Sequence, residues 1–430
     1  MAAEEWYHEF VDKSHTPSKD DIICHFYYDA GRGISTEECV GRVASESSVG
    51  TWTTLSKLPD RLQRLKGIGF EYDDHHIKVS YPKELWEPGN MPQLLSGVAG
   101  NIFGMKAVKH LRLLDMSLPP WFLRSFKGPQ FGIKGIRDVF RVKKRPLTAT
   151  VPKPKLGYSS KEHAEIGYDV WLGGVDLIKD DENLTSQGFN KFKDRITRMA
   201  KLRDKAEKKT GERKGALLNI TAETKEMEKR AAMLADLGWE YAMVDVVTVG
   251  PAAVQTVRDV CEEHGLAIHA HRAMHAMFTK DLRHGMAMPA LVKIMRTIGV
   301  DNIHVGTVIG KLESPKEEVE ANIKQCRDKK IEAGGWLLDQ DWGGTKPVWP
   351  VPSGGLHPGL VPEIVEMFGP DMIIQAGGGV LGHPDGATAG GHALRGAIDA
   401  ALEGVTLKEA AKTDKVLAKA VEKWGKTRPK

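Results

Sequence analysis

The chain has 430 residues, of which 41% are hydrophobic and 27% charged, as in an ordinary globular protein. Lysine and arginine total 61 against 57 aspartates and glutamates, and this net charge of +4 does not indicate a nucleic-acid or membrane-surface protein. The length predicts two or three domains, and the composition excludes collagen, coiled coils and wholesale disorder.

The N-terminus and the cysteines favour a cytoplasmic protein. The opening sequence MAAEEWYHEFVDK is acidic and lacks the apolar segment of a signal peptide. No apolar run approaches the ~18 residues expected of a membrane span. Cys24, Cys39, Cys261 and Cys326 are far apart in the sequence, which is typical of reduced thiols in a large cytosolic protein.

Residues 1–140 have a mixed pattern that predicts an N-terminal α+β domain. We expect strands at 21–31 (DIICHFYYDAG) and 76–82 (HIKVSYP), with a helix at 34–47 between them. A helix-like run is expected at about 94–108.

Residues 141–405 alternate β-rich segments with amphipathic helical stretches. Strands are expected at 147–151, 175–179, 216–221, 241–247, 267–271, 302–308, 348–351 and 372–376. Eight strands alternating with helices over about 250 residues predict a (β/α)8 TIM barrel, the catalytic domain. A doubly wound sheet is the alternative, because sequence does not show whether the sheet closes. Residues 406–430, rich in lysine, predict a helical tail with a solvated surface.

Catalytic groups of such barrels lie where strands end and loops begin. The first strand leads into Lys153-Pro154-Lys155, whose lysines project to the same side of an extended segment. Two ammonium groups in one pocket disfavour each other's charge, so one lysine becomes neutral and able to act as a base. A solvated basic turn is the alternative interpretation.

The second strand ends in Lys179, followed by Asp180, Asp181 and Glu182. Clustered carboxylates suit Mg²⁺, and carbamylation of Lys179 by CO₂ would add another anionic oxygen ligand. A surface charge run is the alternative, which the apolar residues before Lys179 disfavour.

The fifth strand carries His269 and His271, followed by Arg272, which suits an anionic group. The HxH spacing also occurs in metal-dependent hydrolases with barrel folds, although their pair is usually on the first strand. A structural role is the third possibility for either histidine.

The sixth strand carries His304 and leads to a lysine, Lys311, that follows Gly310 as in a P-loop. The spacing is one residue short and Leu312 replaces the hydroxyl that would hold Mg²⁺, so a mobile lid carrying a charge fits better.

Glycine-rich segments follow the last two strands, as Ser353-Gly354-Gly355 and Gly377-Gly378-Gly379. The second formally matches the dinucleotide motif GxGxxG, but no further strand follows it to complete a βαβ unit. Glycine-rich loops in these positions are instead typical of barrel phosphate sites. Arg272 and His304 are candidates for a second phosphate, so the set predicts a bisphosphate, a divalent metal and several lysines.

Eight motifs, in order, resemble the large subunit of ribulose-1,5-bisphosphate carboxylase/oxygenase (RuBisCO) and span nearly the whole chain. They are ESSVGTWTT (46–54), GNIFGMK (100–106), KPKLG (153–157), GGVDLIKDDE (173–182), HAHRAMH (269–275), HVGTVIGKLE (304–313), SGG (353–355) and GGGVLGHP (377–384). The resemblance implies an N-terminal α+β domain followed by a (β/α)8 barrel.

The resemblance also implies roles for individual residues. Carbamylated Lys179 would hold Mg²⁺ with Asp181 and Glu182. Lys153 would be the acid/base of enolisation and final protonation, assisted by Lys155. His271 would be an active-site histidine and Lys311 the lid lysine. Thr51, Trp52, Ser353, Gly354, Gly355, Gly377 and Gly378 would bind one end of the substrate, Arg272 and His304 the other phosphate, and Glu46 and Asn101 would enter the neighbouring subunit's site.

The implied reaction adds CO₂, or O₂ in competition, to the enediolate of ribulose 1,5-bisphosphate, and with CO₂ it yields two molecules of 3-phosphoglycerate. The implied assembly is a homodimer or a ring of dimers, with no small subunit, nucleic acid or membrane involved. Val151-Pro152 before the KPK motif, Val305 and the short ends resemble archaeal-type (form III) enzymes.

Two alternatives remain open at this point. One is a RuBisCO-like enolase or isomerase acting on another sugar phosphate, and the other is a scaffold that kept only the fold. The complete set of lysines disfavours both.

Overall fold

The computed structural model describes residues 6–51, 59–310 and 315–428. The chain divides into two compact units. The sheet unit comprises Met1–Gly128, Met274–Ile298 and Asp328–Thr345, and the barrel unit comprises Pro129–Ala273, Gly299–Arg327 and Lys346–Lys430. Each unit is described by itself.

The barrel unit is built on eight parallel strands. They are β5 (Leu147–Thr150), β6 (Leu177–Lys179), β7 (Gly215–Asn219), β8 (Tyr241–Asp245), β9 (Ala267–His271), β11 (Asn302–His304), β14 (Trp349–Val351) and β15 (Ile373–Gln375). Their order is β14-β11-β9-β8-β7-β6-β5-β15. The two edges meet at a parallel bridge between Ser353 and Gln375, where Gln375 N donates to Pro352 O at 3.0 Å. The eight expected strands are confirmed, and the ring excludes the doubly wound sheet.

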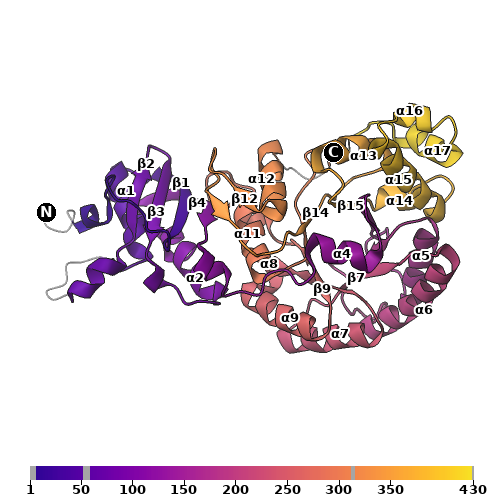
Figure 1. Ribbon diagram of the computed structural model, residues 1–430, viewed down its shortest axis with the longest axis horizontal. Helices are drawn as coiled ribbons and strands as arrows, with labels where there is room; N and C mark the ends of the chain where they lie inside the picture. The colour runs from indigo at the N-terminus through magenta and orange to yellow at the C-terminus, as the bar shows by residue number, and fades with distance from the viewer. Residues whose placement is uncertain (1–5, 52–58, 311–314, 429–430) are drawn as a thin grey trace. The chain divides into compact units, whose positions relative to one another are not determined.

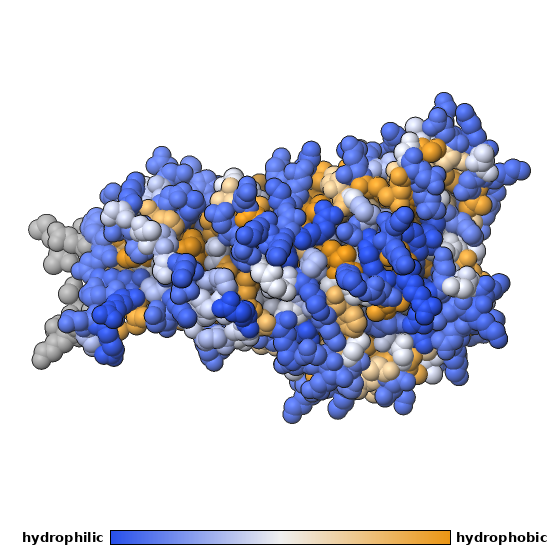
Figure 2. Space-filling model, viewed as in Figure 1, coloured by the Kyte–Doolittle hydropathy of each residue, from blue (hydrophilic) through white to orange (hydrophobic). Residues whose placement is uncertain are grey.

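Helices follow the strands and surround them, as Figure 1 shows for the barrel unit. They include α5 (Ser160–Leu172), α6 (Phe192–Thr210), α7 (Thr224–Asp236), α9 (Pro251–Glu263), α12 (Lys316–Arg327), α13 (Val361–Phe368) and α15 (Ala387–Leu402). α7 buries Met227, Ala231 and Leu234 because their spacing places them on one helical face. Figure 2 shows polar residues over most of the face in view, as expected when the apolar residues line the inner faces of the elements.

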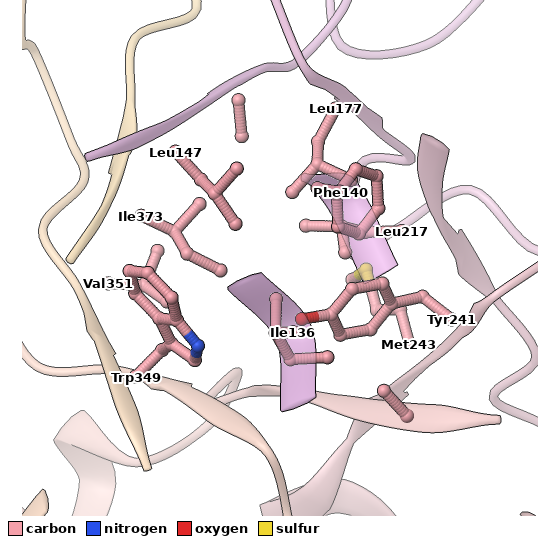
Figure 3. Close-up of a cluster of buried hydrophobic side chains, with 12 residues drawn as sticks. Ile136, Phe140, Leu147, Leu177, Leu217, Tyr241, Met243, Trp349, Val351 and Ile373 are labelled. Atoms are coloured by element: carbon pink, nitrogen blue, oxygen red, sulfur yellow. The ribbon is translucent and has the colours of Figure 1, made fainter. Parts of the chain in front are cut away.

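The amino-terminal end of the barrel is filled by apolar side chains. α4 (Gly132–Phe140) contributes Ile136 and Phe140. Figure 3 shows these two side chains among those of the strands, which include Leu147, Leu177, Leu217, Tyr241, Trp349 and Ile373. Buried Asp301 holds the start of α4 by accepting hydrogen bonds from Phe131 N at 2.7 Å and Gly132 N at 2.9 Å. Polar chemistry is therefore left to the carboxyl ends of the strands.

The sheet unit has five strands in the order β10-β4-β1-β3-β2. They are β1 (Ile22–Ala30), β2 (Ile68–Tyr72), β3 (His76–Tyr81), β4 (Val108–Ser117) and β10 (Gly285–Met286), accompanied by the helix α1 (Thr36–Glu46). The expected strands β1 and β3 and the expected helix α1 are confirmed.

The helix-like run expected at 94–108 is wrong in its second half. The helix α2 (Met91–Val98) is followed by a short 3₁₀ turn, η4 (Asn101–Gly104), and the chain then enters β4. β4 is buried on both faces over Leu111–Met116, so it lacks the alternation of polar and apolar residues that identifies a half-exposed strand.

The tail is helical, as expected, but it is not simply solvated. It forms α16 (Leu407–Ala410) and α17 (Lys415–Trp424), and Leu417 and Ala420 of α17 are buried. α17 packs against α15, so its apolar face belongs to the barrel unit.

Two other expectations concern the chain as a whole. All four cysteines are buried thiols. Within the described residues, no helix combines the length and the apolar character needed to cross a bilayer.

Candidate active site

Polar residues gather at the carboxyl ends of the barrel strands. Lys153 follows β5, Lys179 ends β6, His271 ends β9 and His304 ends β11. Ion pairs join Lys153 to Asp181, and His271 to both Glu182 and Asp245. Most of the predicted barrel residues are therefore brought to one end of the barrel, opposite α4.

Lys179 is a buried amine beside carboxylates. Its side chain is 1% exposed, and its Nζ donates to the carbonyl oxygen of Asp180 at 2.7 Å. Burial lowers its pKa even though the charges of Glu182 and Asp181 oppose that shift. A larger fraction of Lys179 is consequently neutral than of an exposed lysine, which is the form that reacts with CO₂.

Asp180 points away from this group, as the alternation along the strand predicts. Its carboxylate accepts hydrogen bonds from Arg195 at 2.9 Å and from Asn219 N at 2.9 Å, and it lies 3.2 Å from His163 Nε2. Asp180 therefore anchors the end of β6 to α5, α6 and β7, so that Lys179 and Asp181 face the opposite side.

The lysine pair after β5 reaches the same carboxylates. Lys153 Nζ lies 3.4 Å from Asp181 Oδ2, and Lys155 Nζ lies 2.6 Å from Glu182 Oε1. Burial lowers the pKa of Lys153. Burial acts in the same direction on Lys155, but the hydrogen bond and charge of Glu182 outweigh it and raise the pKa.

One lysine of the pair is thus shifted toward neutrality, as expected, but mutual repulsion is a smaller cause than burial. The chain bends after β5 rather than continuing extended, and each ammonium forms a hydrogen bond with a different carboxylate, Lys153 with Asp181 and Lys155 with Glu182.

Histidines line the neighbouring strand ends. His271 Nδ1 lies 3.1 Å from Asp245 Oδ1, and its Nε2 lies 3.7 Å from Glu182 Oε2. Burial and the nearby charge of Lys179 lower the pKa of His271. A neutral imidazole at this place can accept or donate a proton.

His269 belongs to a different hydrogen-bond network, which includes Asn302 and His304. Its Nδ1 lies 2.8 Å from Asn302 Oδ1 and its Nε2 lies 3.0 Å from His304 Nε2, while His304 Nδ1 lies 2.6 Å from Ser353 Oγ. The two histidines of the HxH pair therefore differ in their hydrogen-bond and ion-pair partners, although both rings pack against the ring of His304. In the part of the chain that the structure describes, no three His, Cys, Asp or Glu side chains form a metal-binding group.

The glycine loops after β14 and β15 lie side by side, because Ser353 and Gln375 form the bridge that closes the barrel. Gly354 and Gly355 have φ angles of +104° and +77°, which side chains disfavour. At Gly377, a Cβ atom would lie 3.0 Å from Lys153 Cε. Glycine at 377 thus lets the lysine approach the start of α14 (Gly378–Leu381).

Arg272 lies at the end of β9 and is 7% exposed. Burial lowers its pKa to about 10, so it remains a cation at neutral pH, suited to a phosphate. Buried His304 has its pKa lowered well below the usual range by burial and by the neighbouring charged form of His271.

The remaining predicted residues lie elsewhere. Glu46 ends α1 and Asn101 begins η4, and both are exposed in the sheet unit. Ser47 Oγ donates to Gly97 O at 2.6 Å, so the segments that carry them are neighbours. Thr51 also belongs to the sheet unit, while Trp52 and Lys311 lie outside the described residues.

Sequence reasoning missed Asp245 and Asn219. Asp245 is the last residue of β8 and pairs with His271, and Asn219 is the last residue of β7 and donates from Nδ2 to Glu182 O at 3.1 Å. Each is a polar residue ending a buried strand, which is the same signal that identified Lys179.

The donor set fits a hard divalent cation. Asp181 and Glu182 offer carboxylate oxygens within reach of two lysine ammoniums, which shows that this position favours positive charge. The pKa of Glu182 is about 2, because the hydrogen bond from Lys155 and the charge of Lys179 outweigh the effect of burial. Two carboxylates are few for a cation, and a carbamate on Lys179 would supply the third anionic group.

Models of two domain families match most of the chain. The model described as ribulose bisphosphate carboxylase large chain, catalytic domain, matches residues 132–424, and that of the N-terminal domain matches residues 9–122. A protein named ribulose bisphosphate carboxylase from Pyrococcus abyssi is 52% identical over 99% of this chain and 98% of its own. The protein of the same name from Methanocaldococcus jannaschii is 47% identical over 97% of this chain and all of its own.

Solved structures agree with the sequence comparisons. The octameric Rubisco of Pyrococcus horikoshii, in complex with sulfate ion, has a TM-score of 0.92 and 52% identity, covering 98% of this chain and 97% of that one. The dimeric archaeal Rubisco of Hyperthermus butylicus has a TM-score of 0.94 and 46% identity, covering 98% of this chain and all of that one.

Proposed function

Because this chain belongs to the ribulose bisphosphate carboxylase large-chain family, we propose that its barrel end carboxylates ribulose 1,5-bisphosphate, with O₂ as a competing co-substrate. The observation that carries the proposal is Lys179, a buried amine with a lowered pKa beside two carboxylates. The family membership and this site leave no observation that favours a RuBisCO-like isomerase.

The metal site would consist of carbamylated Lys179, Asp181 and Glu182. Asn219 holds the backbone of Glu182, and Asp180 anchors the strand, so the carboxylates are positioned before a cation arrives. Mg²⁺ bound there would supply Lewis-acid stabilisation of negative charge on the substrate oxygens.

Lys153 is the proposed acid/base of enolisation and of the final protonation. Its lowered pKa makes its ammonium a stronger acid than that of an exposed lysine, and its Nζ lies 3.4 Å from Asp181 Oδ2. The charge of Lys155 would assist by stabilising nearby anionic oxygens. Lys311 would carry a positive charge on a lid over the CO₂.

The chemistry then follows from an enediolate made by removal of the C3 proton. Its C2 forms a bond to CO₂, water adds at C3, and the C2–C3 bond breaks. One fragment leaves as 3-phosphoglycerate. The other leaves as a carbanion that takes a proton, proposed to come from Lys153, and becomes the second molecule. His271, whose Nδ1 lies 3.1 Å from Asp245 Oδ1, would exchange a proton with a substrate hydroxyl.

The two phosphates would occupy two separate places at the mouth of the barrel. One would lie against backbone N–H groups of the loops after β14 and β15, at Gly355, Gly377 and Gly378, where bare glycines allow close approach. Ser353 and Gly354 belong to the same loops, and Thr51 and Trp52 would complete this end. Arg272 and His304 would bind the other phosphate.

We also propose a homodimer or ring of dimers without a small subunit. The relatives with solved structures include a dimer and an octamer. The sheet unit exposes four large apolar side chains within nine residues, Met274 (42%), Met277 (79%), Phe278 (47%) and Leu282 (64%), which suits a protein interface. Glu46 and Asn101 are exposed and near each other, as residues offered to a partner's site should be. The four buried thiols support a cytoplasmic location.

Labelled CO₂ tests the proposal directly. The purified protein, preincubated with bicarbonate and Mg²⁺, should convert ribulose 1,5-bisphosphate and labelled CO₂ into labelled 3-phosphoglycerate, with two product molecules for each CO₂ fixed. A chelator should abolish the reaction. If the substrate is consumed without fixing label, the carboxylase assignment is wrong.

A further inference from the structure

The two glycine loops are fastened to the C-terminal segment of the same chain. The loop after β14 continues through His357 to Gly359, and the segment after β15 continues through α14 to His383. Both histidines are 4% exposed, and both contact the chain between Val416 and Thr427.

Each histidine makes the same pair of hydrogen bonds. His357 Nδ1 accepts from Gly359 N at 3.2 Å, so its Nε2 donates to Thr427 O at 2.7 Å. His383 Nδ1 accepts from Asp385 N at 3.1 Å, and its Nε2 donates to Val416 O at 3.0 Å. One nitrogen therefore shapes the loop, and the other ties it to the C-terminal segment.

Close packing reinforces these ties. The His357 ring stacks on Trp424 with centroids 5.7 Å apart and an angle of 23° between planes. A Cβ atom on Gly359 would lie 1.7 Å from Gly425 O, so the tail backbone runs directly against the loop. Lys423 Nζ donates to Gly382 O at 2.6 Å.

The two loops are also pressed against each other. A Cβ atom on Gly379 would lie 2.3 Å from Leu356 O and 2.5 Å from His357 Cα. A displacement of His357 is therefore transmitted to α14 and to the loop before it, because close-packed groups cannot move independently.

We propose that residues 416–427 form a clamp that positions both glycine loops for one phosphate of the substrate, with His357 and His383 as its positioning residues. The inference rests on the proposed function only in naming the phosphate. Neither histidine would touch the reacting atoms. The clamp acts by fixing the backbone N–H groups that face the anion, since small errors in such placement weaken binding.

Substituting asparagine for either histidine should remove one of its two hydrogen bonds and keep the other. In His357→Asn the side-chain oxygen can still accept from Gly359 N, but the shorter side chain cannot reach Thr427 O. Ending the chain after Gly425 removes Thr427 and breaks the same bond from the other side. Matched controls are exposed His392→Asn and a chain ending after Arg428, which keeps Thr427.

The measurements are KM and kcat for ribulose 1,5-bisphosphate and the inhibition constant of inorganic phosphate, in the otherwise intact protein. His357→Asn and the chain ending after Gly425 should each raise both KM and the inhibition constant about three- to tenfold, the order expected for one lost hydrogen bond. The value of kcat should change less than about twofold, and the controls should match wild type. His383→Asn should behave like His357→Asn.

Combining His357→Asn with the shortened chain should add little to either change alone, because both remove the same bond. Unchanged KM and phosphate inhibition in folded variants, or losses that multiply in the combined variant, would overturn the clamp. A lower unfolding midpoint with unchanged KM would also overturn the clamp, because the contact would then serve only the stability of the fold.

Calorimetric titration of ribulose 1,5-bisphosphate separates this inference from the proposed function. Weakened binding in His357→Asn, with no carboxylation by wild type, would support the clamp and refute the carboxylase. If wild type carboxylates the substrate and His357→Asn binds it as tightly as wild type does, the carboxylase is supported and the clamp is refuted.

Discussion

Lys179 is a lysine whose proposed role requires it to be neutral before it can react with CO₂. Burial lowers its pKa, so the neutral form becomes available at lower pH than for an exposed lysine. Carbamate formation releases protons, which also favours the activated form at higher pH. The proposed activation would therefore depend on one side chain and its surroundings.

The first prediction follows from that protonation. Initial activity after preincubation with bicarbonate and Mg²⁺ should rise with preincubation pH and level off once Lys179 is mostly neutral. Lys179→Arg should lose carboxylation, because a guanidinium stays charged and forms no carbamate ligand. Lys214→Arg is the control, since Lys214 is equally buried but pairs with Glu212 outside the site. Near wild-type carboxylation by Lys179→Arg would show that the metal site is misassigned.

The second prediction concerns Asp180. Burial opposes its ionisation, but Arg195 and His163 outweigh burial and hold its pKa at about 2. A carboxyl group with a pKa below its unfolded value of 3.8 stabilises the fold above pH 4, and the contribution is lost as pH falls toward 2. The shift corresponds to about 2 kcal/mol.

Asp180→Asn should therefore lower the free energy of unfolding at pH 7 by about 3–5 kcal/mol, since it also leaves Arg195 without its buried partner. In denaturant titrations, the difference in free energy of unfolding between Asp180→Asn and wild type should shrink between pH 4 and pH 2. Asp194→Asn is the control, because its ion pair with Arg198 is half exposed and should contribute little. A deficit that stays constant with pH would contradict the assignment of the shift to Asp180.

At the scale of elements, α4 determines which end of the barrel is available for chemistry. Its Ile136 and Phe140 occupy the amino-terminal end among the strand side chains (Figure 3). The strands' polar last residues are therefore left at the other end, where loops rather than packed helices follow them.

The third prediction tests this element. Phe140→Ala should lower the free energy of unfolding by about 3–5 kcal/mol, because the cavity forms in a tightly packed cluster. Carboxylation per folded molecule should remain close to wild type, since α4 lies away from the site. Lys134→Ala, with an 89% exposed side chain on the same helix, should change stability by less than about 0.5 kcal/mol. A large rise in KM or a large fall in kcat in folded Phe140→Ala would mean that α4 also shapes the site.

At the scale of the whole molecule, the proposed site would draw on two chains. Glu46 and Asn101 belong to the sheet unit and Lys179 to the barrel unit, and a two-fold axis would give two equivalent sites for each dimer.

The fourth prediction uses that symmetry. Glu46→Gln and Lys179→Ala should each be nearly inactive alone. In a hybrid dimer one site receives both lesions and the other receives none. Co-expression in equal amounts should make about half of the dimers hybrid and leave about a quarter of all sites intact. The activity regained should approach that fraction of wild type, whereas mixing the two pure proteins without exchange should regain none. No recovery in proven hybrids would place Glu46 in its own chain's site.

The sequence by itself determined the eight barrel strands, the polar residues at their ends and the glycine loops. Each of these features depends on a short run of residues, such as a buried apolar strand ending in Lys179, and so it is visible locally. The same logic would have found Asp245 and Asn219, which also end buried strands.

Only the tertiary structure decided which of these residues meet. It separated His269 from His271, gave Lys153 and Lys155 opposite pKa shifts, and placed β4 in a sheet without visible alternation. It also joined Thr427 to His357, 70 residues away in sequence. Burial, pairing and charge depend on neighbours that closure of the barrel brings together, and no local run of residues contains that information.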